Sequence, residues 1–274
     1  MQSLNSEKNV KRQYSTANNL NSRISLHQRF STNKLGWANW VFQNYALEAN
    51  QSVLELGCGN GGIWASNVNK VHEGVKLTLT DISEGMLEAA RENTKSLGSV
   101  EYRVADAQDI PFAENSFDIV IANHMLYHVP DISKALGEIS RVLKPDGIFY
   151  ATTIGKDNMK ELAELLFDFD ERIDFANDLA ADAFGLETGG EILRGFFKSV
   201  EVKRYEDSLH IPEAEPLVEY ILSSQGIGNV NDIITGEKLS QFNAYVLGLF
   251  AKRGCIDIRK DAGMFISSNP VRVW

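Results

Sequence analysis

Short apolar runs alternate with amphipathic segments between residues 52 and 153. Runs of strand length are found at Val53–Leu56, Val75–Thr80, Val100–Val104, Phe117–Ala122 and Ile148–Thr153. Apolar residues at helical spacing lie between several of these runs, at Ile63 to about Val71, Ser83–Leu97 and Ile132–Leu143. Ser83 suits a helix N-cap, Gly98 suits a helix end, and Lys144-Pro145-Asp146-Gly147 predicts a turn. Strands that alternate with helices predict an α/β fold, a parallel sheet covered by helices on both faces.

The flanking regions follow a helical pattern. Residues 1–36 carry six basic residues against Glu7, a net charge of +5, and enough apolar residues to predict one or two short helices packed on the main domain. Leu35–Leu47 predicts a core-facing helix, with Trp37, Trp40, Phe42 and Tyr45. After residue 155, helical spacing recurs over Met159–Ile173, on to about Phe184, and over Thr188–Phe197, Pro212–Leu222 and Leu239–Lys252. Strands are expected at Val200–Ile211 and as one bent final strand over Ile256–Arg259 and Gly263–Ser267.

Composition narrows the class of protein. The 274 residues include 27 Lys and Arg against 37 Asp and Glu, a formal charge of -10, which argues against a nucleic-acid partner held through phosphates. Two cysteines do not make a disulfide framework. A signal-peptide pattern and an apolar run of membrane-spanning length are both missing. We therefore expect a cytoplasmic protein with no membrane insertion.

Acidic residues are concentrated between Asp157 and Glu191, where eleven acids face only Lys160 and Arg172. A solvated helical face explains this pattern. Alternatively, the region is an acidic lid that favours a cationic substrate or docks on the basic N-terminal segment.

A glycine-rich turn follows the first strand at once. Gly57, Gly59 and Gly62 fit the G-x-G-x-x-G pattern of dinucleotide sites, whereas Gly57, Gly59 and Gly61 fit G-x-G-x-G. Either pattern lets the backbone turn sharply and approach a ligand closely, because no Cβ blocks it. The glycines alone leave the cofactor open.

The ends of the next strands add polar groups at the same edge of the sheet. Asp81 stands 22 positions after Gly59, where a carboxylate can accept hydrogen bonds from both hydroxyls of a ribose. Asp106, beside the backbone N–H of Ala107, can accept from an exocyclic amine and so select adenine. Ile82 and Met86 offer an apolar slot for a purine, and Asn123 faces the same crevice. Ligands bind at this edge in open α/β sheets.

Together these motifs resemble those of class I S-adenosylmethionine-dependent methyltransferases, of the small-molecule type that includes ubiquinone- and menaquinone-biosynthesis-like members. The resemblance rests on Val53–Gly61, Leu79–Ser83 with Met86-Leu87, Ala105–Phe112, Phe117–Val120 and Leu143–Gly147. It implies a Rossmann-like seven-stranded sheet, mostly parallel with an antiparallel last strand. It also implies an N-terminal helical segment over 1–50 and a methyltransferase domain over 51–274, with a helical lid insert at about 156–198.

The same resemblance implies the roles of single residues. Gly57 and Gly59 would lie against the methionine moiety, Glu55 would help to hold its amino end, and Asn123 would line that side. Asp81 would bind the ribose, Ile82 and Met86 would sandwich the adenine, and Asp106 and Ala107 would read its edge. Glu55 also bears on the choice of cofactor, since an acid at the loop suits an ammonium and would repel a pyrophosphate.

The reaction is less visible in the sequence than the cofactor. The protein mainly has to align the nucleophile and exclude water, and a base is needed only if the acceptor must lose a proton. His124 and His128 are the candidates for such a base, or for structural roles, and their spacing would let them share a helical face. Tyr14 and Arg29 are candidates to close over the cofactor, and Cys58 is expected to be a small turn residue. No metal site is expected.

We therefore expect methyl transfer from S-adenosylmethionine to a small-molecule acceptor. Methylation of a protein or RNA and a noncatalytic adenosylmethionine-binding module are the alternatives.

Overall fold

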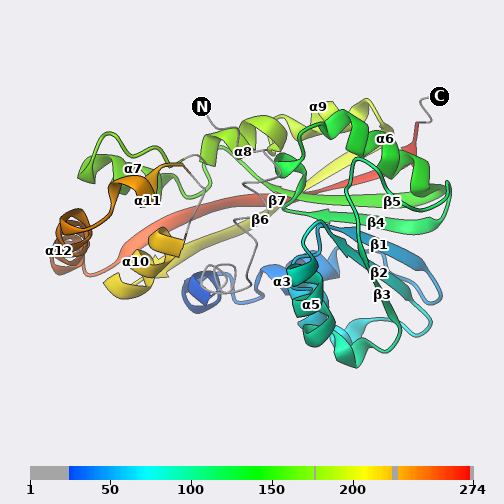
Figure 1. The fold of residues 1–274 in the computed structure, drawn as a ribbon, viewed down its shortest axis with the longest axis horizontal. Helices are drawn as coiled ribbons and strands as arrows, with labels where there is room; N and C mark the ends of the chain where they lie inside the picture. Colours follow the sequence, from blue (N-terminus) through cyan, green and yellow to red (C-terminus); the bar gives the residue numbers. More distant parts are fainter. Residues whose placement is uncertain (1–24, 176, 224–227, 272–274) are drawn as a thin grey trace.

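A seven-stranded sheet forms the centre of the structure (Figure 1). The structure is a computed structural model that describes residues 25–175, 177–223 and 228–271. The strand order is β3-β2-β1-β4-β5-β7-β6. The strands are β1 Ser52–Leu56, β2 Lys76–Asp81, β3 Val100–Val104, β4 Phe117–Asn123, β5 Leu143–Ile154, β6 Phe197–Ile211 and β7 Ile256–Pro270. Strands β1 to β5 pair in parallel, and β7 pairs antiparallel with both β5 and β6. The predicted mostly parallel sheet with an antiparallel last strand is confirmed.

Helices cover both faces of the sheet, with α3, α4 and α5 on one side and α6, α8 and α9 on the other (Figure 1). The helices are α3 Trp37–Gln43, α4 Gly62–Ala65, α5 Glu84–Asn93, α6 Ile132–Val142, α7 Lys160–Phe169, α8 Asn177–Phe184, α9 Gly189–Arg194, α10 Ala214–Ser223, α11 Val230–Ile233 and α12 Glu237–Arg253. The 3₁₀ helices are η1 Val68–Lys70, η2 Lys95–Leu97 and η3 Leu126–His128. Residues 25–30 are also helical.

Side chains of the central strands point alternately to the two faces of the sheet and are buried on both, which explains why these strands are apolar throughout. Val53 and Ile119 pack with α3 to α5, whereas the next residues, Leu54 and Val120, pack with α6. Successive side chains of a strand point to opposite faces, and both faces are covered here. Ser83 caps α5 as predicted, because its side chain accepts a hydrogen bond from the backbone N–H of Met86.

Three predicted boundaries are wrong for local reasons. The helix expected from Ile63 to about Val71 stops at Ala65, and Asn67 there donates from its side-chain amide to the carbonyls of Ala38 and Ile63. The helix expected over Thr188–Phe197 ends at Arg194, because Phe197 already pairs in β6. The turn at 144–147 lies within β5 as an irregularity, where the pairing of β4 passes from Leu143 to Ile148.

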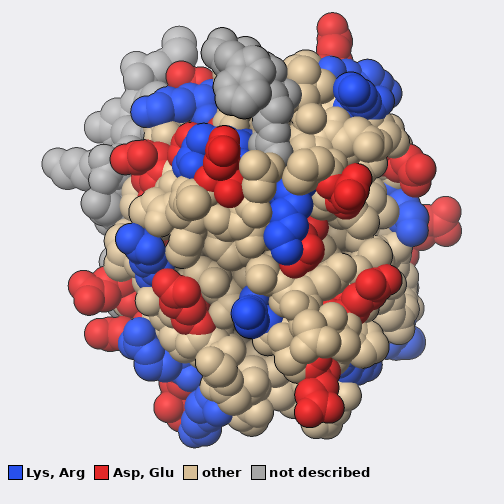
Figure 2. Space-filling view, turned by 90° about the vertical axis from the view of Figure 1, so that its right-hand side faces the viewer, with Lys and Arg blue, Asp and Glu red and all other residues tan. Residues whose placement is uncertain are grey.

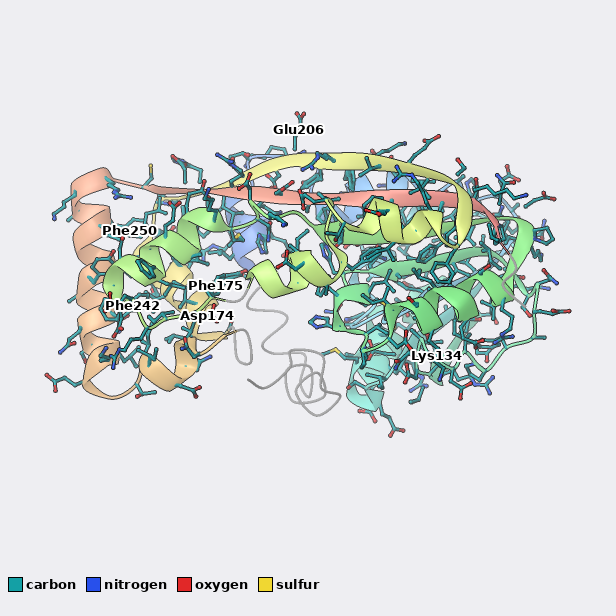
Figure 3. The ribbon with its side chains drawn as sticks, turned by 90° about the horizontal axis from the view of Figure 1, so that it is seen from above. Lys134, Asp174, Phe175, Glu206, Phe242 and Phe250 are labelled. Atoms are coloured by element: carbon teal, nitrogen blue, oxygen red, sulfur yellow. The ribbon has the colours of Figure 1, made fainter. Side chains whose placement is uncertain are left out.

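The β6–β7 pair continues beyond the sheet into a second hydrophobic cluster, which we call the distal lobe. Pairing of β5 with β7 ends at Ile154 and Ala262, whereas β6 and β7 stay paired out to Ile211 and Ile256. Around this extension pack α7, α10, α11, α12 and the helical residues 25–30 (Figure 1). Phe242, Phe250 and Phe175 lie together in this lobe, well apart from Lys134 on α6 in the sheet half of the molecule (Figure 3). The chain between β5 and β7 thus builds a core of its own around one end of the strand pair.

Charges of both signs are interspersed on the described surface shown in Figure 2, and no continuous basic groove crosses that face. Acids of the 157–191 region pair with cations of β6, β7 and α12, such as Arg204 with Glu187, Arg259 with Asp157 and Lys238 with Asp170. Within the described parts of the chain, no helix has the length and apolar character needed to cross a membrane.

The distal lobe yields a stability prediction. Phe242 is fully buried there, so Phe242→Ala should lower the free energy of unfolding by about 3–5 kcal/mol. Leu247, on the same helix but 60% exposed, is the matched control, and Leu247→Ala should change it by less than about 0.5 kcal/mol. Urea unfolding would measure both. Equal effects of the two substitutions would show that α12 does not pack as described.

Candidate active site

One cavity of about 990 Å³ lies at the carboxyl ends of β1, β2 and β4 and extends toward the distal lobe. It is lined by every residue that the sequence proposed for the cofactor: Glu55, Gly57, Gly59, Asp81, Ile82, Met86, Asp106, Ala107 and Asn123. Cys58, His124 and His128 line it as well. Residues distant in sequence are therefore brought to one cavity, because the carboxyl ends of parallel strands lie at the same edge of the sheet.

The glycine turn has the geometry of the G-x-G-x-G pattern. Gly57, Gly59 and Gly61 have φ of 63°, 55° and 69°, in the left-handed region, whereas Gly62 is the first residue of α4 and has no positive φ. A Cβ on Gly57 would stand 2.9 Å from Cβ of Met125. The turn thus requires glycine at the first three positions by conformation, and at Gly57 also by contact.

Asp81 links the end of β2 to the glycine turn. Its Oδ2 accepts a hydrogen bond from the backbone N–H of Gly59 at 2.9 Å, and its Oδ1 accepts from that of Ser83 at 2.9 Å. Each carboxylate oxygen can accept a second hydrogen bond, so both remain able to receive a ligand hydroxyl. Desolvation raises the pKa of this carboxyl. The backbone holds Asp81 in place independently of any ligand.

Glu55 is buried at the end of β1, between two side-chain donors. Trp64 donates from its indole N–H to Oε2 at 2.5 Å, and Asn123 donates from its amide to Oε1 at 2.7 Å. Burial raises the pKa of Glu55 to about 7, although both hydrogen bonds act to lower it. A buried carboxyl with a raised pKa ionises more readily when a cation lies beside it.

Tyr45 and Thr152 complete this buried network. The Asn123 amide donates to the Tyr45 hydroxyl at 2.9 Å, and Thr152 donates to Oδ1 of Asn123 at 3.2 Å. The Tyr45 and Trp64 rings stack with centroids 6.2 Å apart. Asn123 is therefore engaged at both its amide nitrogen and its oxygen, and it fixes the position of Glu55.

The residues expected at the adenine end differ in exposure. Met86 and Ala107 are buried, whereas Asp106 is exposed at the rim. The carboxylate of Asp106 accepts from the backbone N–H of Gln108 at 2.8 Å and from its side-chain amide at 3.1 Å. This end of the cavity combines an apolar floor with an acceptor group at its edge.

The two histidines do not share a helical face, contrary to the expectation from their spacing. His124 directly follows β4 with a φ of 48°, and its backbone N–H donates to the carbonyl of Thr152, whereas His128 ends the 3₁₀ helix η3. Burial, aided by the positive charge of Lys260, lowers the pKa of His124 to about 4. His124 is therefore neutral at physiological pH and is better suited to hydrogen bonding than to acting as a general base.

Arg29 does not close over the cavity, because it pairs with Glu213 at 3.0 Å and is not among the lining residues. Tyr14 lies outside the described residues. None of the described acids between Asp157 and Glu191 lines the cavity, so the idea of an acidic lid above a cationic substrate is wrong for them.

The sequence reasoning missed the far wall of the cavity. Trp37, Met159, Tyr220 and Lys260 line it from four separate segments. The Trp37 ring stacks on Trp40 with centroids 5.3 Å apart and lies tilted against His124 with centroids 5.0 Å apart. The dense aromatic set near residue 40 was the available signal, although it was interpreted as core packing alone. Nothing in the local sequence marks Lys260, because its place depends on the pairing of β7 with β6.

Opposite pKa shifts at Glu55 and His124 predict a pH dependence in the ligand-free protein. The Glu55 carboxyl has its pKa raised from 4.5 to about 7, so its stabilising contribution is complete below pH 4.5 and is lost as pH rises to about 7. Glu55→Gln removes this loss. Its free energy of unfolding, relative to the wild type, should rise by up to about 3 kcal/mol across that range in urea titrations.

His124→Asn is the counterpart, since asparagine tolerates the positive φ. The His124 pKa is lowered from 6.5 to about 4, so the contribution of this side chain is present above pH 6.5 and is lost as pH falls to about 4. Relative to the wild type, this variant should become less stable as pH rises. Curves that run parallel to the wild type for both variants would contradict the described burial.

Comparison with known proteins gives the fold and site a family context. Residues 54–151 match the family model described as a methyltransferase domain. Demethylmenaquinone methyltransferase of Staphylococcus aureus is 32% identical over 165 residues, which cover 59% of this chain and 65% of that protein. The chain thus matches somewhat less than two thirds of the length of these curated relatives.

Solved structures share the fold at low identity. Phosphoethanolamine N-methyltransferase 2 of Haemonchus contortus, in complex with S-adenosyl-L-methionine, has a TM-score of 0.58 at 19% identity over 99% of this chain and 61% of that one. The [4+2]-cyclase SpnF has a TM-score of 0.54 at 18% identity over 94% of this chain and 95% of that one. These matches show that residues 54–151 form a methyltransferase domain, and the solved structures share its fold.

Proposed function

We propose that this chain transfers a methyl group from S-adenosylmethionine to a small-molecule acceptor. The observation that carries the proposal is the single cavity of about 990 Å³, which joins the predicted cofactor residues to an aromatic wall built by other segments. Its volume is at the upper end of the roughly 300–1,000 Å³ of small-molecule sites. It therefore offers room for a second ligand beside the cofactor.

The residues present suit this cofactor, which supplies a sulfonium with a transferable methyl group. We propose that Asp81 receives the ribose hydroxyls, because both of its oxygens are held in place and retain acceptor capacity. Ile82 and Met86 would contact the adenine, and Asp106 with Ala107 would read its edge. Glu55, fixed by Trp64 and Asn123, would supply negative charge toward the ammonium of the methionine part.

The acceptor end supports a small molecule over a protein or an RNA. Its walls come from the distal lobe and from residues 27–39 as well as from the sheet, so a small acceptor can contact several segments at once and be aligned with the methyl group. The name of the curated relative makes demethylmenaquinone the first acceptor to assay. The cytoplasmic location remains a prediction.

The fold alone does not fix the reaction, since one neighbour of similar fold is named a cyclase. A noncatalytic adenosylmethionine-binding module is therefore the second candidate. Release of adenosylhomocysteine on addition of an acceptor distinguishes the methyltransferase from the noncatalytic module, because only methyl transfer produces adenosylhomocysteine.

Calorimetric titration with S-adenosylmethionine, S-adenosylhomocysteine and NAD tests the cofactor. Asp81→Asn should weaken adenosylhomocysteine binding by about tenfold to a hundredfold, because hydrogen bonds to a charged acceptor contribute about 1.5–3 kcal/mol. The matched control is Asp146→Asn, an exposed acid of β5 outside the cavity, which should bind as the wild type does. Tight binding of NAD without binding of adenosylhomocysteine would refute the proposal.

A further inference from the structure

The charged residues of the cavity are separated along its length. Among the described lining residues, the acids are Glu55, Asp81 and Asp106, all at strand ends on the cofactor side. The basic residues are Lys34 and Lys260, both next to Ser31: Lys34 donates to its carbonyl at 2.9 Å, and Lys260 shares Asp207 with its hydroxyl. One end thus favours a cationic ligand and the other an anionic one.

Lys260 is a nearly buried cation with a well-defined setting. Its side chain is 10% exposed, and its Nζ lies 2.8 Å from Oδ2 of Asp207 and 5.4 Å from the centre of the Tyr205 ring. An ammonium group has three N–H donors, of which Asp207 takes one and the ring face attracts another. The position of Lys260 in the cavity wall leaves donor capacity toward a ligand.

Asp207 binds several other donors besides Lys260. This fully buried carboxylate also accepts from the Ser31 hydroxyl at 2.7 Å and from the backbone N–H groups of Asn33 and Ser208, each at 2.9 Å. Lys260 is therefore one of several groups that use the acceptor capacity of Asp207. The remaining field of Lys260 reaches His124, whose proton affinity it lowers.

Aromatic rings form part of the cavity wall on the side of Lys260. The ring centroid of Trp37 lies 5.2 Å from that of Tyr205 and 5.0 Å from that of His124. Tyr220 packs edge-on against His27, with ring centroids 5.6 Å apart. Rings of this kind favour a flat unsaturated ligand through stacking and edge-to-face contacts. A planar ring that carries one anionic oxygen matches both the wall and the cation.

We propose that Lys260 binds an ionised oxygen of the methyl acceptor, which makes the acceptor a phenol or an enol of comparable acidity. This inference rests on the proposed function and names the acceptor class for the same cavity. On binding, the O–H bond breaks, its electron pair stays on the oxygen, and the proton passes to bulk water. No protein base is required, in keeping with the neutral His124. Lys260 acts as the binding residue for the oxygen, and Asp207 is a positioning residue for Lys260.

The test uses para-nitrophenol, whose phenolate absorbs visible light, with the full chain saturated by adenosylhomocysteine. Bound probe should show an apparent pKa lower than that of free probe by about one unit or more, because an opposite charge at contact distance favours the ionised form. Lys260→Met should abolish this shift. Lys203→Met is the matched control, since Lys203 is exposed, bonds Asn44 and lies outside the cavity wall, and it should leave the shift unchanged.

Asp207→Asn tests whether misfolding explains the loss of the pKa shift in Lys260→Met. It keeps Lys260 and removes its competing anion, so it should lower the apparent pKa of the bound phenol further, opposite in sign to Lys260→Met. A purely structural ion pair predicts that both substitutions act in the same direction, and that result would overturn the inference.

Two further outcomes would also overturn it: probe bound without a shift in its pKa, or no binding at millimolar probe. Adenosylhomocysteine titration of each variant keeps the two proposals distinct. Normal adenosylhomocysteine binding without a phenol shift refutes only the role of Lys260. Failure of the wild type to bind adenosylhomocysteine refutes the proposed function itself.

Discussion

The antiparallel pairing of β6 with β7 is the constraint on which the rest of the molecule depends. At one end the pair completes the sheet beside β5, and at the other it forms the base of the distal lobe. A paired strand ribbon resists bending far more than a single connection would, because each residue is held by the neighbouring strand. The cavity lies beside this ribbon, which joins the sheet to the distal lobe and so helps to set the spacing of the two walls. Glu206, near the middle of β6, projects outward from this ribbon (Figure 3).

The cofactor side was predictable because its chemistry is encoded locally. Each candidate residue follows its own strand within a few positions, and parallel strands bring their carboxyl ends to one edge. The glycine turn is a similar case, since a run of positive φ values restricts the residue type directly. Even here the sequence did not reveal that Trp64 holds Glu55, because that contact depends on how α4 packs over β1.

The acceptor side was not predictable, for a physical reason. Tertiary packing alone brings Lys260, Trp37 and Tyr220 to one cavity. They are far apart in the sequence, and hydrophobic periodicity carries no information about such distant neighbours. The same applies to the start of β6, whose first residue, Phe197, the sequence pattern places in a helix. Phe197 has an apolar neighbourhood compatible with either state, and pairing with Pro270 in β7 decides between them.

The end of β5 and the point at which β7 comes back beside it are neighbours, because Ile154 and Ala262 are register partners. The residues between them form a long insertion, and strand pairing holds its two ends together whatever the insertion contains. Loops anchored in this way tolerate changes of length at little entropic cost. Divergence within this one stretch can therefore remodel much of the acceptor wall while the nucleoside end keeps its framework. In that sense the two halves of the cavity can evolve at different rates.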